Sequence, residues 1–299
     1  MKKVSVVIPA YNMADLTART VESVLNQTYA DVEIIVVDDG STDGTREKMR
    51  SFGDAVKYVY KENGGASSAR NLGIKLSKGE YTALLDCDDV YAPDKIEKSV
   101  RFLEENPGYG FVHSAANIVD ENGKVLEYFS MGEKSGTGWI AESLILRNFI
   151  CNSTVVARRE CFSGAGFFDE SIFIPADWDM WLRLSEKYRA GFIDEPLTMY
   201  LRRTKGSYTH RHLENALKHQ KIVLEKFFKR NPGLVKRLKN KAYSGIFFCH
   251  AGECARAGDT LRAVKAALLS VLLERSRAGQ ICAKWFRRTR QGRGERRSS

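Results

Sequence analysis

Two runs of carboxylates stand where an apolar stretch of the chain ends: Asp38 and Asp39 after residues 33–37, and DCDD at residues 86–89 after residues 83–85. Neighbouring acids repel one another unless a cation or hydrogen-bond donors compensate their charge. A hard divalent ion such as Mg²⁺ or Mn²⁺ binds oxygen ligands, typically one or two carboxylates together with substrate phosphates. The second run therefore predicts a metal site, and the alternative is an acidic surface turn.

The spacing within the second run adds a geometric expectation. In an extended backbone, residues two apart point the same way. Asp86 and Asp88 should then face one site, while Cys87 turns towards the core.

Three further polar segments could take part in the same chemistry. PAYN at residues 9–12 follows an apolar run, although a strand-to-helix turn capped by Asn12 explains it equally well. NGGASSARN at residues 63–71 joins a glycine-rich loop to a helix start, where Arg70 could bind phosphate or carboxylate. In ADWDMWLRL at residues 176–184, the acids could merely complement a helix dipole.

Short β-branched runs alternate with helix-like stretches in the first part of the chain, which indicates an α/β sheet. Such a sheet binds ligands at the carboxyl ends of its strands, where these polar segments lie. The expected strands are residues 4–8, 33–37, 56–60, 82–85, 111–115 and 154–157. The expected helices are residues 14–26, 44–52, 67–77, 93–105 (with Pro93 in the first turn), 139–147, 177–187, 211–230, 234–256 and 260–273.

The last expected helix has Asp259 as its predicted N-cap. Its large apolar side chains share one face, and we expect that face to cover a core rather than to bind a partner. They are Leu261, Val264, Leu268, Val271 and Leu272.

Bulk properties narrow the function classes. The 299 residues allow a sizeable core, and no apolar run reaches the roughly 18 residues that a membrane-spanning helix needs. The start of the chain does not read as a signal peptide, and the six cysteines lack metal-ligand spacing, so we expect a reduced, cytoplasmic protein. Nine Lys or Arg against one acid in residues 275–299 supply most of the net charge of +10.

Taken together, the segments resemble the family 2 group of inverting glycosyltransferases. SVVIPAYN, IIVVDDGSTDGT, NGGASSARNLGI, GEYTALLDCDD, GFFDES and ADWDMWLRL appear in the family's order over about residues 4–200. The resemblance implies a GT-A fold, a Rossmann-like mixed α/β sheet flanked by helices. We expect this domain at residues 1–205, a helical extension at 206–274, and a disordered or membrane-surface tail at 275–299.

The resemblance also implies a role for each matching residue. Tyr11 is expected to stack on the nucleotide base, and Asp39, or else Asp38, to accept a hydrogen bond from uracil. Asp88 resembles the metal ligand of the DxD motif, and Asp177 resembles the general base. The remaining nucleotide-binding residues that the resemblance implies are Pro9, Ala10, Asn63, Gly65, Arg70, Asp86 and Cys87, with Asp86 also a second metal ligand.

The implied reaction moves a sugar from a nucleotide-diphosphate donor, UDP-sugar in the first instance, to an acceptor hydroxyl with inversion. Mn²⁺ or Mg²⁺ is the implied cofactor. The acceptor would be a glycan or lipid-linked molecule in surface polysaccharide or glycolipid assembly. A basic tail resting on anionic lipid would place the enzyme at the inner face of the cell membrane.

Two positions depart from the family pattern. Ala176 precedes the expected base where the family commonly has Glu, and YLRR at residues 200–203 replaces a Tyr-Arg-x-His segment. His210 or His212 could replace the missing histidine ligand. Alternatively, Arg202 or Arg203 could neutralise the diphosphate directly.

Two other functions compete with this interpretation. A sugar nucleotidyltransferase has a similar sheet, but it needs a basic, glycine-rich loop that PAYNMADLTAR does not supply. A nucleic-acid-binding protein could act through the basic tail, yet the tail carries no binding motif. We therefore expect no nucleic-acid partner.

Overall fold

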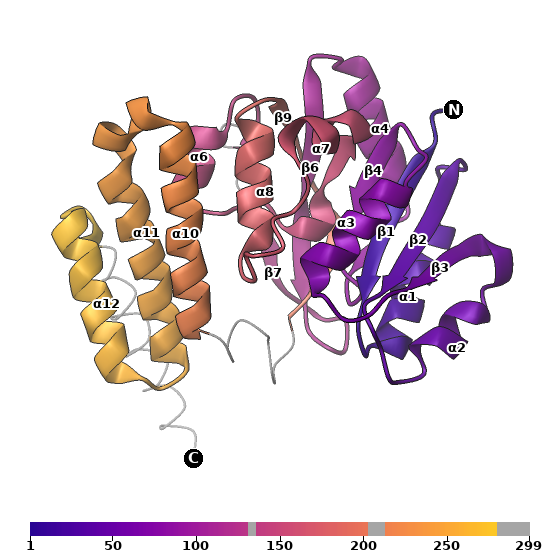
Figure 1. The fold of residues 1–299 in the computed structure, drawn as a ribbon, viewed down its shortest axis with the longest axis horizontal. Coiled ribbons are helices and arrows are strands. Elements are labelled where there is room, and N and C mark those ends of the chain that lie inside the picture. The colour runs from indigo at the N-terminus through magenta and orange to yellow at the C-terminus, as the bar shows by residue number, and fades with distance from the viewer. Residues whose placement is uncertain (131–135, 203–212, 280–299) are drawn as a thin grey trace. The chain divides into compact units, whose positions relative to one another are not determined.

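The computed structural model describes residues 1–130, 136–202 and 213–279 (Figure 1). The chain forms two compact units. The first consists of Met1–Leu144 and Asn148–Ser207, and the second consists of Ile145–Arg147 and Tyr208–Ser299. Residues 145–147 therefore group with the C-terminal part of the chain, which the sequence did not indicate.

A single mixed sheet forms the centre of the first unit, and its strands in the described residues follow the order β3-β2-β1-β4-β8-β6-β9-β5, with β7 paired to β6. β3, β2, β1 and β4 are parallel, β8 is antiparallel to both β4 and β6, and β6 and β9 are parallel. The strands are β1 Val4–Ala10, β2 Val32–Asp38, β3 Val56–Tyr60, β4 Tyr81–Leu84, β5 Val90–Tyr91, β6 Tyr109–Val119, β7 Val125–Phe129, β8 Val156–Arg158 and β9 Arg189–Leu201.

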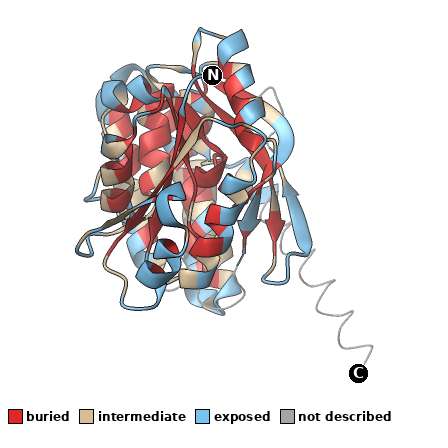
Figure 2. Cartoon of the chain, turned by 90° about the vertical axis from the view of Figure 1, so that its right-hand side faces the viewer, coloured by how far each residue is buried: buried red, intermediate tan, exposed pale blue. Residues whose placement is uncertain are grey.

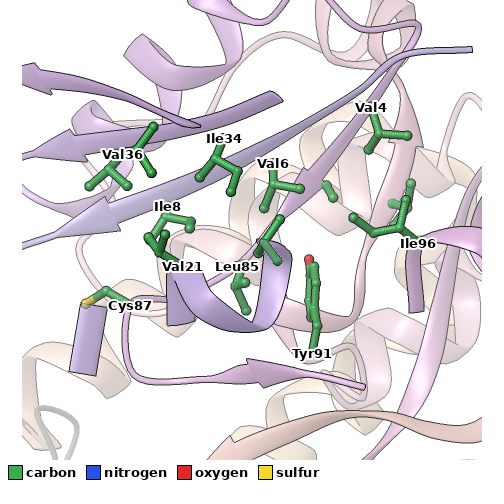
Figure 3. Close-up of a cluster of buried hydrophobic side chains, with 14 of the residues drawn as sticks. Val4, Val6, Ile8, Val21, Ile34, Val36, Leu85, Cys87, Tyr91 and Ile96 are labelled. Atoms are coloured by element: carbon green, nitrogen blue, oxygen red, sulfur yellow. The ribbon is translucent and has the colours of Figure 1, made fainter. Parts of the chain in front are cut away.

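Helices cover both faces of the parallel half of the sheet, and for that reason every residue of β1 is buried (Figure 2). α1 (Ala14–Leu25) and α4 (Lys95–Glu105) contribute Val21 and Ile96 to a core with Val6 and Ile8 (Figure 3). α3 (Ala66–Leu76) packs on the other face. The remaining helices of this unit are α2 Thr45–Arg50, α6 Ala141–Leu146, α7 Arg159–Ala165 and α8 Ala176–Ser185.

A glycine allows α3 to approach the sheet closely. A Cβ atom at Gly73 would lie 2.3 Å from Cγ1 of Val7 on β1. This distance is far below van der Waals contact, so any larger residue would push the helix away from the strand.

Some expected elements differ from the observed ones. β9, β7, β5 and α7 were not predicted, and α4 begins at Lys95 with Asp94 as its N-cap, so the placement of Pro93 in the first turn was wrong. β9 contains Pro196 and three charged residues, and its pairing with β6 is broken by register shifts. Such a strand lacks the apolar alternation by which strands are recognised.

The second unit contains α10 (Leu213–Arg230), α11 (Val235–Arg256) and α12 (Thr260–Leu273), and α11 contacts both of the others (Figure 1). Asp259 caps α12 as predicted, because its side chain accepts a hydrogen bond from the backbone N–H of Arg262. The predicted buried face was wrong. α12 buries Ala263, Ala266 and Ser270 instead, and its leucines at 261, 268 and 272 are exposed.

No helix in residues 1–130, 136–202 and 213–279 is both long and apolar enough to cross a membrane. The five cysteines in this part of the chain, Cys87, Cys151, Cys161, Cys249 and Cys254, are free thiols.

Candidate active site

The parallel strands bring the polar segments to one edge of the sheet. Ala10 at the end of β1 pairs with Asp38 at the end of β2, and β4 runs beside β1 in the same direction. The backbone N–H of Asp39 donates to the carbonyl of Ala10 over 2.8 Å. The residues that follow these strands therefore lie together, as expected for ligand-binding loops.

Asp38 is buried and serves the loop that follows it. Its carboxylate accepts hydrogen bonds from the backbone N–H of Ser41 at 2.8 Å and from the Tyr58 hydroxyl at 2.5 Å. Burial, reinforced by this bond to Asp38, raises the pKa of Tyr58 to about 12. These bonds account for the burial of the first acid of the pair without any ligand.

Asp39 connects β2 to the glycine-rich loop before α3. Its Oδ1 accepts hydrogen bonds from Lys61 Nζ at 2.6 Å and from the backbone N–H of Gly64 at 2.9 Å. Its Oδ2 accepts one from the backbone N–H of Gly65 at 2.7 Å, and Asn63 Nδ2 donates to its carbonyl. Lys61 was not predicted, although a lysine directly after a strand that ends beside an acidic pair was an available signal.

Tyr11, directly after the end of β1, is 48% exposed. The next residue, Asn12, has a left-handed φ of 51°, and its Oδ1 accepts a hydrogen bond from the backbone N–H of Thr42 at 2.8 Å. Asn12 is not a helix cap, because the N–H of Ala14 bonds to Asp43 Oδ2 instead. The two loops are thus joined next to Tyr11.

The DCDD run forms a turn rather than an extended segment. The N–H of Asp89 donates to the carbonyl of Asp86 over 3.0 Å, so the alternation argument for this run was wrong. Cys87 nevertheless lies in the core as predicted, with Sγ 3.7 Å from Met13 Sδ (Figure 3). Burial raises the pKa of its thiol to about 12. Because the side chain is buried, only the backbone of Cys87 could contact a nucleotide. Asp88 is half-buried.

Asp89 is the fully buried acid of the turn, and sequence reasoning gave it no role. It accepts hydrogen bonds from the Ser153 hydroxyl and, at 2.9 Å, from the backbone N–H of Leu201. Burial, followed by the charges of Asp88 and Asp86, raises its pKa well above the usual range. Asp89 therefore fixes the turn to the end of β9.

Asp86 binds two side chains through a single oxygen. Arg70 Nη2 and Asn152 Nδ2 donate to its Oδ1 at 2.7 and 2.8 Å. Burial tends to lower the pKa of Arg70, but Asp86 and, more weakly, Asp177 raise it above its usual value. Arg70 Nε and Asn152 Oδ1 are buried without a hydrogen-bond partner among the described residues. Buried polar atoms without a partner are uncommon in folded proteins, and a ligand bound beside Asp86 would account for these two.

α3 also positions the segment that leads to the expected base. Asn71 donates to the carbonyl of Phe168 and to Glu170 Oε1, and its Oδ1 accepts from the N–H of Phe168 at 2.8 Å. From α8, Arg183 donates to the carbonyls of residues 165–167. Asp179 forms a buried ion pair with Arg183 at 2.8 Å, which is a more specific role than complementing the helix dipole.

A cavity of about 270 Å³ opens between Asp86 and Asp177. Asp177 is the second residue of α8, and its Oδ1 accepts a hydrogen bond from the N–H of Trp178. Burial raises the pKa of Asp177, against the opposing charge of Arg70. The other lining residues are Ala116, Ile118, Phe129, Asn148, Phe149, Ile150, Cys151, Asn152 and Tyr200. Asn148 and Asn152 were missed, because single amides in an apolar run give no sequence signal.

The structure thus brings Asp86, Asp177 and Arg70 together, whereas Asp39 and Tyr11 lie along the same sheet edge outside the lining of this cavity. Arg202 pairs with Glu127 at 2.8 Å, both side chains being about half exposed. Arg202 thus has a carboxylate partner on β7. Arg203, His210 and His212, the other candidates in this region, lie outside the described residues.

Residues 5–151 match the model of the family described as Glycosyl transferase family 2. A glycosyltransferase of Rickettsia bellii is 38% identical over 198 residues, 66% of this chain and 28% of that protein. One of Rickettsia typhi is 38% identical over 191 residues, 62% of this chain and 60% of that protein. Chondroitin synthase of Escherichia coli is 31% identical over 188 residues, 61% of this chain and 26% of that protein. The chain thus spans less than two thirds of each of these relatives.

Two solved structures share the fold. TarS of Staphylococcus aureus, residues 1–349 in complex with UDP-GlcNAc, matches with a TM-score of 0.63 at 17% identity, covering 93% of this chain and 92% of that one. The mannosyltransferase PcManGT from Pyrobaculum calidifontis, in complex with GDP-Man and Mn²⁺, matches with a TM-score of 0.62 at 20% identity, covering 94% and 81%. Both are GT-A proteins, and the likeness confirms the predicted fold class.

Proposed function

The chain belongs to glycosyltransferase family 2, and on that premise we propose that it transfers a sugar from a nucleotide-diphosphate donor to an acceptor hydroxyl with inversion. One observation carries the proposal: a carboxylate with a raised pKa, Asp177, lines the same cavity as Asp86, the partner of Arg70. Such a displacement requires a base at the cavity and a cationic side chain close to it, and Arg70 is held next to the cavity by Asp86.

Asp177 would act as the general base. A raised pKa makes a carboxylate a stronger proton acceptor, provided that the pH keeps it ionised. Its carboxylate takes the proton of the acceptor hydroxyl as that oxygen attacks the anomeric carbon. The bond from this carbon to the diphosphate breaks on the opposite face. A single displacement of this kind inverts the anomeric configuration.

The donor would lie along the sheet edge, with its base towards Tyr11 and its diphosphate towards Arg70. The exposed ring of Tyr11 can stack on a base, and Asp39 stands beside it with an Oδ2 that receives one bond from Gly65. TarS has been captured with UDP-GlcNAc and PcManGT with GDP-Man. We propose UDP for this chain because Asp39 can accept the N–H of a uracil ring.

The acidic turn fits a divalent cation, which we propose to be Mn²⁺ or Mg²⁺ bound by Asp88 and Asp86. Asp86 Oδ2 has no hydrogen-bond partner among the described residues, and Asp88 adds enough negative charge to raise the pKa of Asp89. No third His, Cys, Asp or Glu joins them within residues 1–130, 136–202 and 213–279. Substrate phosphate and water commonly complete the shell of such an ion. When bound, the cation would neutralise charge on the departing diphosphate.

We propose that the acceptor is a glycan or lipid-linked hydroxyl, in surface polysaccharide or glycolipid assembly at the inner face of the cell membrane. The relatives named chondroitin synthase support a polysaccharide product. Most of the basic tail expected to bind membrane, residues 280–299, lies outside the described residues. The family match does not favour the sugar nucleotidyltransferase or nucleic-acid-binding alternatives.

Thermal unfolding with UDP and Mn²⁺ tests the donor site. The pair should raise the melting temperature, and Asp88→Ala should abolish the rise that depends on Mn²⁺. Asp54→Asn, at an exposed acid that is not among the proposed site residues, is the control and should respond as the wild type does. A rise indifferent to Asp88 would contradict the metal assignment. The same assay with UDP-, GDP- and dTDP-sugars would then identify the donor.

Asp177→Asn tests the base. The amide keeps the shape of the side chain but cannot accept the proton, so donor binding should persist while transfer falls by about a hundredfold or more. Binding is measured by calorimetry, and transfer by release of the nucleotide diphosphate. Transfer at the wild-type rate would remove Asp177 from the mechanism.

A further inference from the structure

α12 has an exposed apolar face opposite to the face by which it packs. Ser270 donates from its hydroxyl to the carbonyl of Ser244 at 2.9 Å, and the Ser244 hydroxyl donates to the carbonyl of Ser270 at 2.8 Å. These bonds, together with buried Ala263 and Ala266, set α12 against α11. The small side chains allow the two helices to approach closely, and the large ones are left outside.

The exposed side chains form one stripe along the helix. Their exposed fractions are 83% for Leu261, 39% for Val264, 60% for Leu268 and 79% for Leu272. Their spacing of three, four and four residues places them on one helical face. Single exposed leucines need no explanation, but a continuous row of them marks an interaction surface. We call these four residues the α12 stripe.

The charge of this part of the chain indicates the partner. Residues 208–299 contain 22 Lys or Arg and six Asp or Glu, whereas residues 1–207 contain 25 and 31. Residues 208–299 are therefore strongly cationic, and residues 1–207 are anionic. Lys265 is exposed on α12, and exposed Arg275 follows its end. Arg262 is also exposed, although it pairs with Asp259 and Glu214. An apolar row bordered by cations fits a surface that is apolar beneath and anionic at its boundary.

We propose that the α12 stripe binds the surface of an anionic lipid bilayer. The leucines would enter the boundary between headgroups and acyl chains, and the long basic side chains would reach the headgroups. With 14 residues, α12 is about 21 Å long, so it would lie in the plane of the interface rather than cross it. The inference does not rest on the proposed function, since it concerns a surface formed by α12 alone.

Other partners fit the observations less well. Nucleic acid would use the cations but leave the leucines in water. A second copy of the chain would cover the leucines, but it would bring two strongly cationic regions together, and like charges repel. The chain's own residues 280–299 carry further Lys and Arg and would add positive charge beside Lys265.

Vesicle flotation of the full chain tests the proposal. The probes are vesicles of phosphatidylcholine alone and of phosphatidylcholine mixed with phosphatidylglycerol. The test variant is Leu268→Ser/Leu272→Ser, and the matched control is Leu25→Ser/Leu126→Ser, at two exposed leucines of the first unit. A third variant ends at residue 279. Circular dichroism confirms that each variant is folded, and light scattering gives its oligomeric state.

We expect the wild type to bind vesicles that contain phosphatidylglycerol and to bind less as salt is raised. Loss of two leucines that enter the bilayer should weaken the partition by about a hundredfold. The control variant and the truncated chain both retain Leu268 and Leu272, so both should still bind these vesicles. The proposal is overturned if the test variant binds as the wild type does, or if only truncation abolishes binding. It is equally overturned if the wild type is a dimer that the leucine changes dissociate while vesicle binding stays unchanged.

Discussion

Lys95→Met should change the pH dependence of folding in the first unit, because this lysine is buried without a carboxylate partner among the described residues. Its Nζ donates to the carbonyl of Thr154 at 2.5 Å and to the Ser114 hydroxyl at 3.3 Å. Thr154 directly follows Asn152 and Ser153, which bind the acidic turn. Burial lowers the pKa of Lys95 from 10.5 to about 7.

The sign of the effect follows from proton counts. Between pH 7 and pH 10.5 the unfolded chain holds a proton at Lys95 that the folded chain largely lacks. Stability therefore rises with pH across this window, since the unfolded state binds more protons. From these two pKa values, the wild type should gain about 3 kcal/mol between pH 7 and pH 9.5 from this group alone. Methionine at this position cannot contribute to that gain.

Urea denaturation at pH 7 and pH 9.5, followed by the fluorescence of buried Trp178 and Trp181, measures the free energy of unfolding of this unit. Relative to Lys95→Met, the free energy of unfolding of the wild type should be about 3 kcal/mol higher at pH 9.5 than at pH 7. Lys57→Met, at an exposed lysine of β3, controls for titration of other groups. A difference that stays constant within about 0.5 kcal/mol would refute a neutral Lys95 in the folded state.

Three further outcomes are expected. Gly73→Ala should lower the free energy of unfolding by about 1–3 kcal/mol because of the contact with Val7, and Val7→Ala in the same chain should restore part of it. Asp89→Ala should cost about 2–4 kcal/mol in urea denaturation, since it leaves buried donors unpaired; a smaller loss than Asp54→Ala causes would contradict this role. Tyr11→Ala should weaken UDP binding about tenfold in calorimetry without changing stability, and unchanged affinity would exclude stacking.

The sequence predicted those parts of the site that depend only on which residues directly follow a strand. Carboxylates directly after apolar strands mark the edge of a parallel sheet, so the common placement of Asp39, Asp86 and the loop before α3 follows from the sequence alone. Asp177 was found through a family motif, not through periodicity. Its proximity to Asp86 depends on α8 and β4, which are about ninety residues apart, and no local pattern carries that information.

The sequence-based predictions failed where two local structures fit the same residues equally well. The DCDD run could form either a strand or a turn. Asp89 accepts hydrogen bonds from Ser153 and Leu201, which are remote in the chain, and these bonds stabilise the turn. α12 is apolar on two faces, so periodicity alone gives no choice between them. Ala263, Ala266 and Ser270 form the buried face because small residues bring the helix closer to α11.

The hydrogen bond between Asp89 and Leu201 joins residues 112 positions apart. A nascent chain on the ribosome therefore cannot complete the wall of the cavity when only the strands before β9 have emerged, because Tyr200 of β9 lines that cavity. It must wait until β9 is also free of the exit tunnel. Catalytic competence should consequently appear in one late step of synthesis, and partial chains that end before β9 should be inert even where the loops after β1 and β2 have folded.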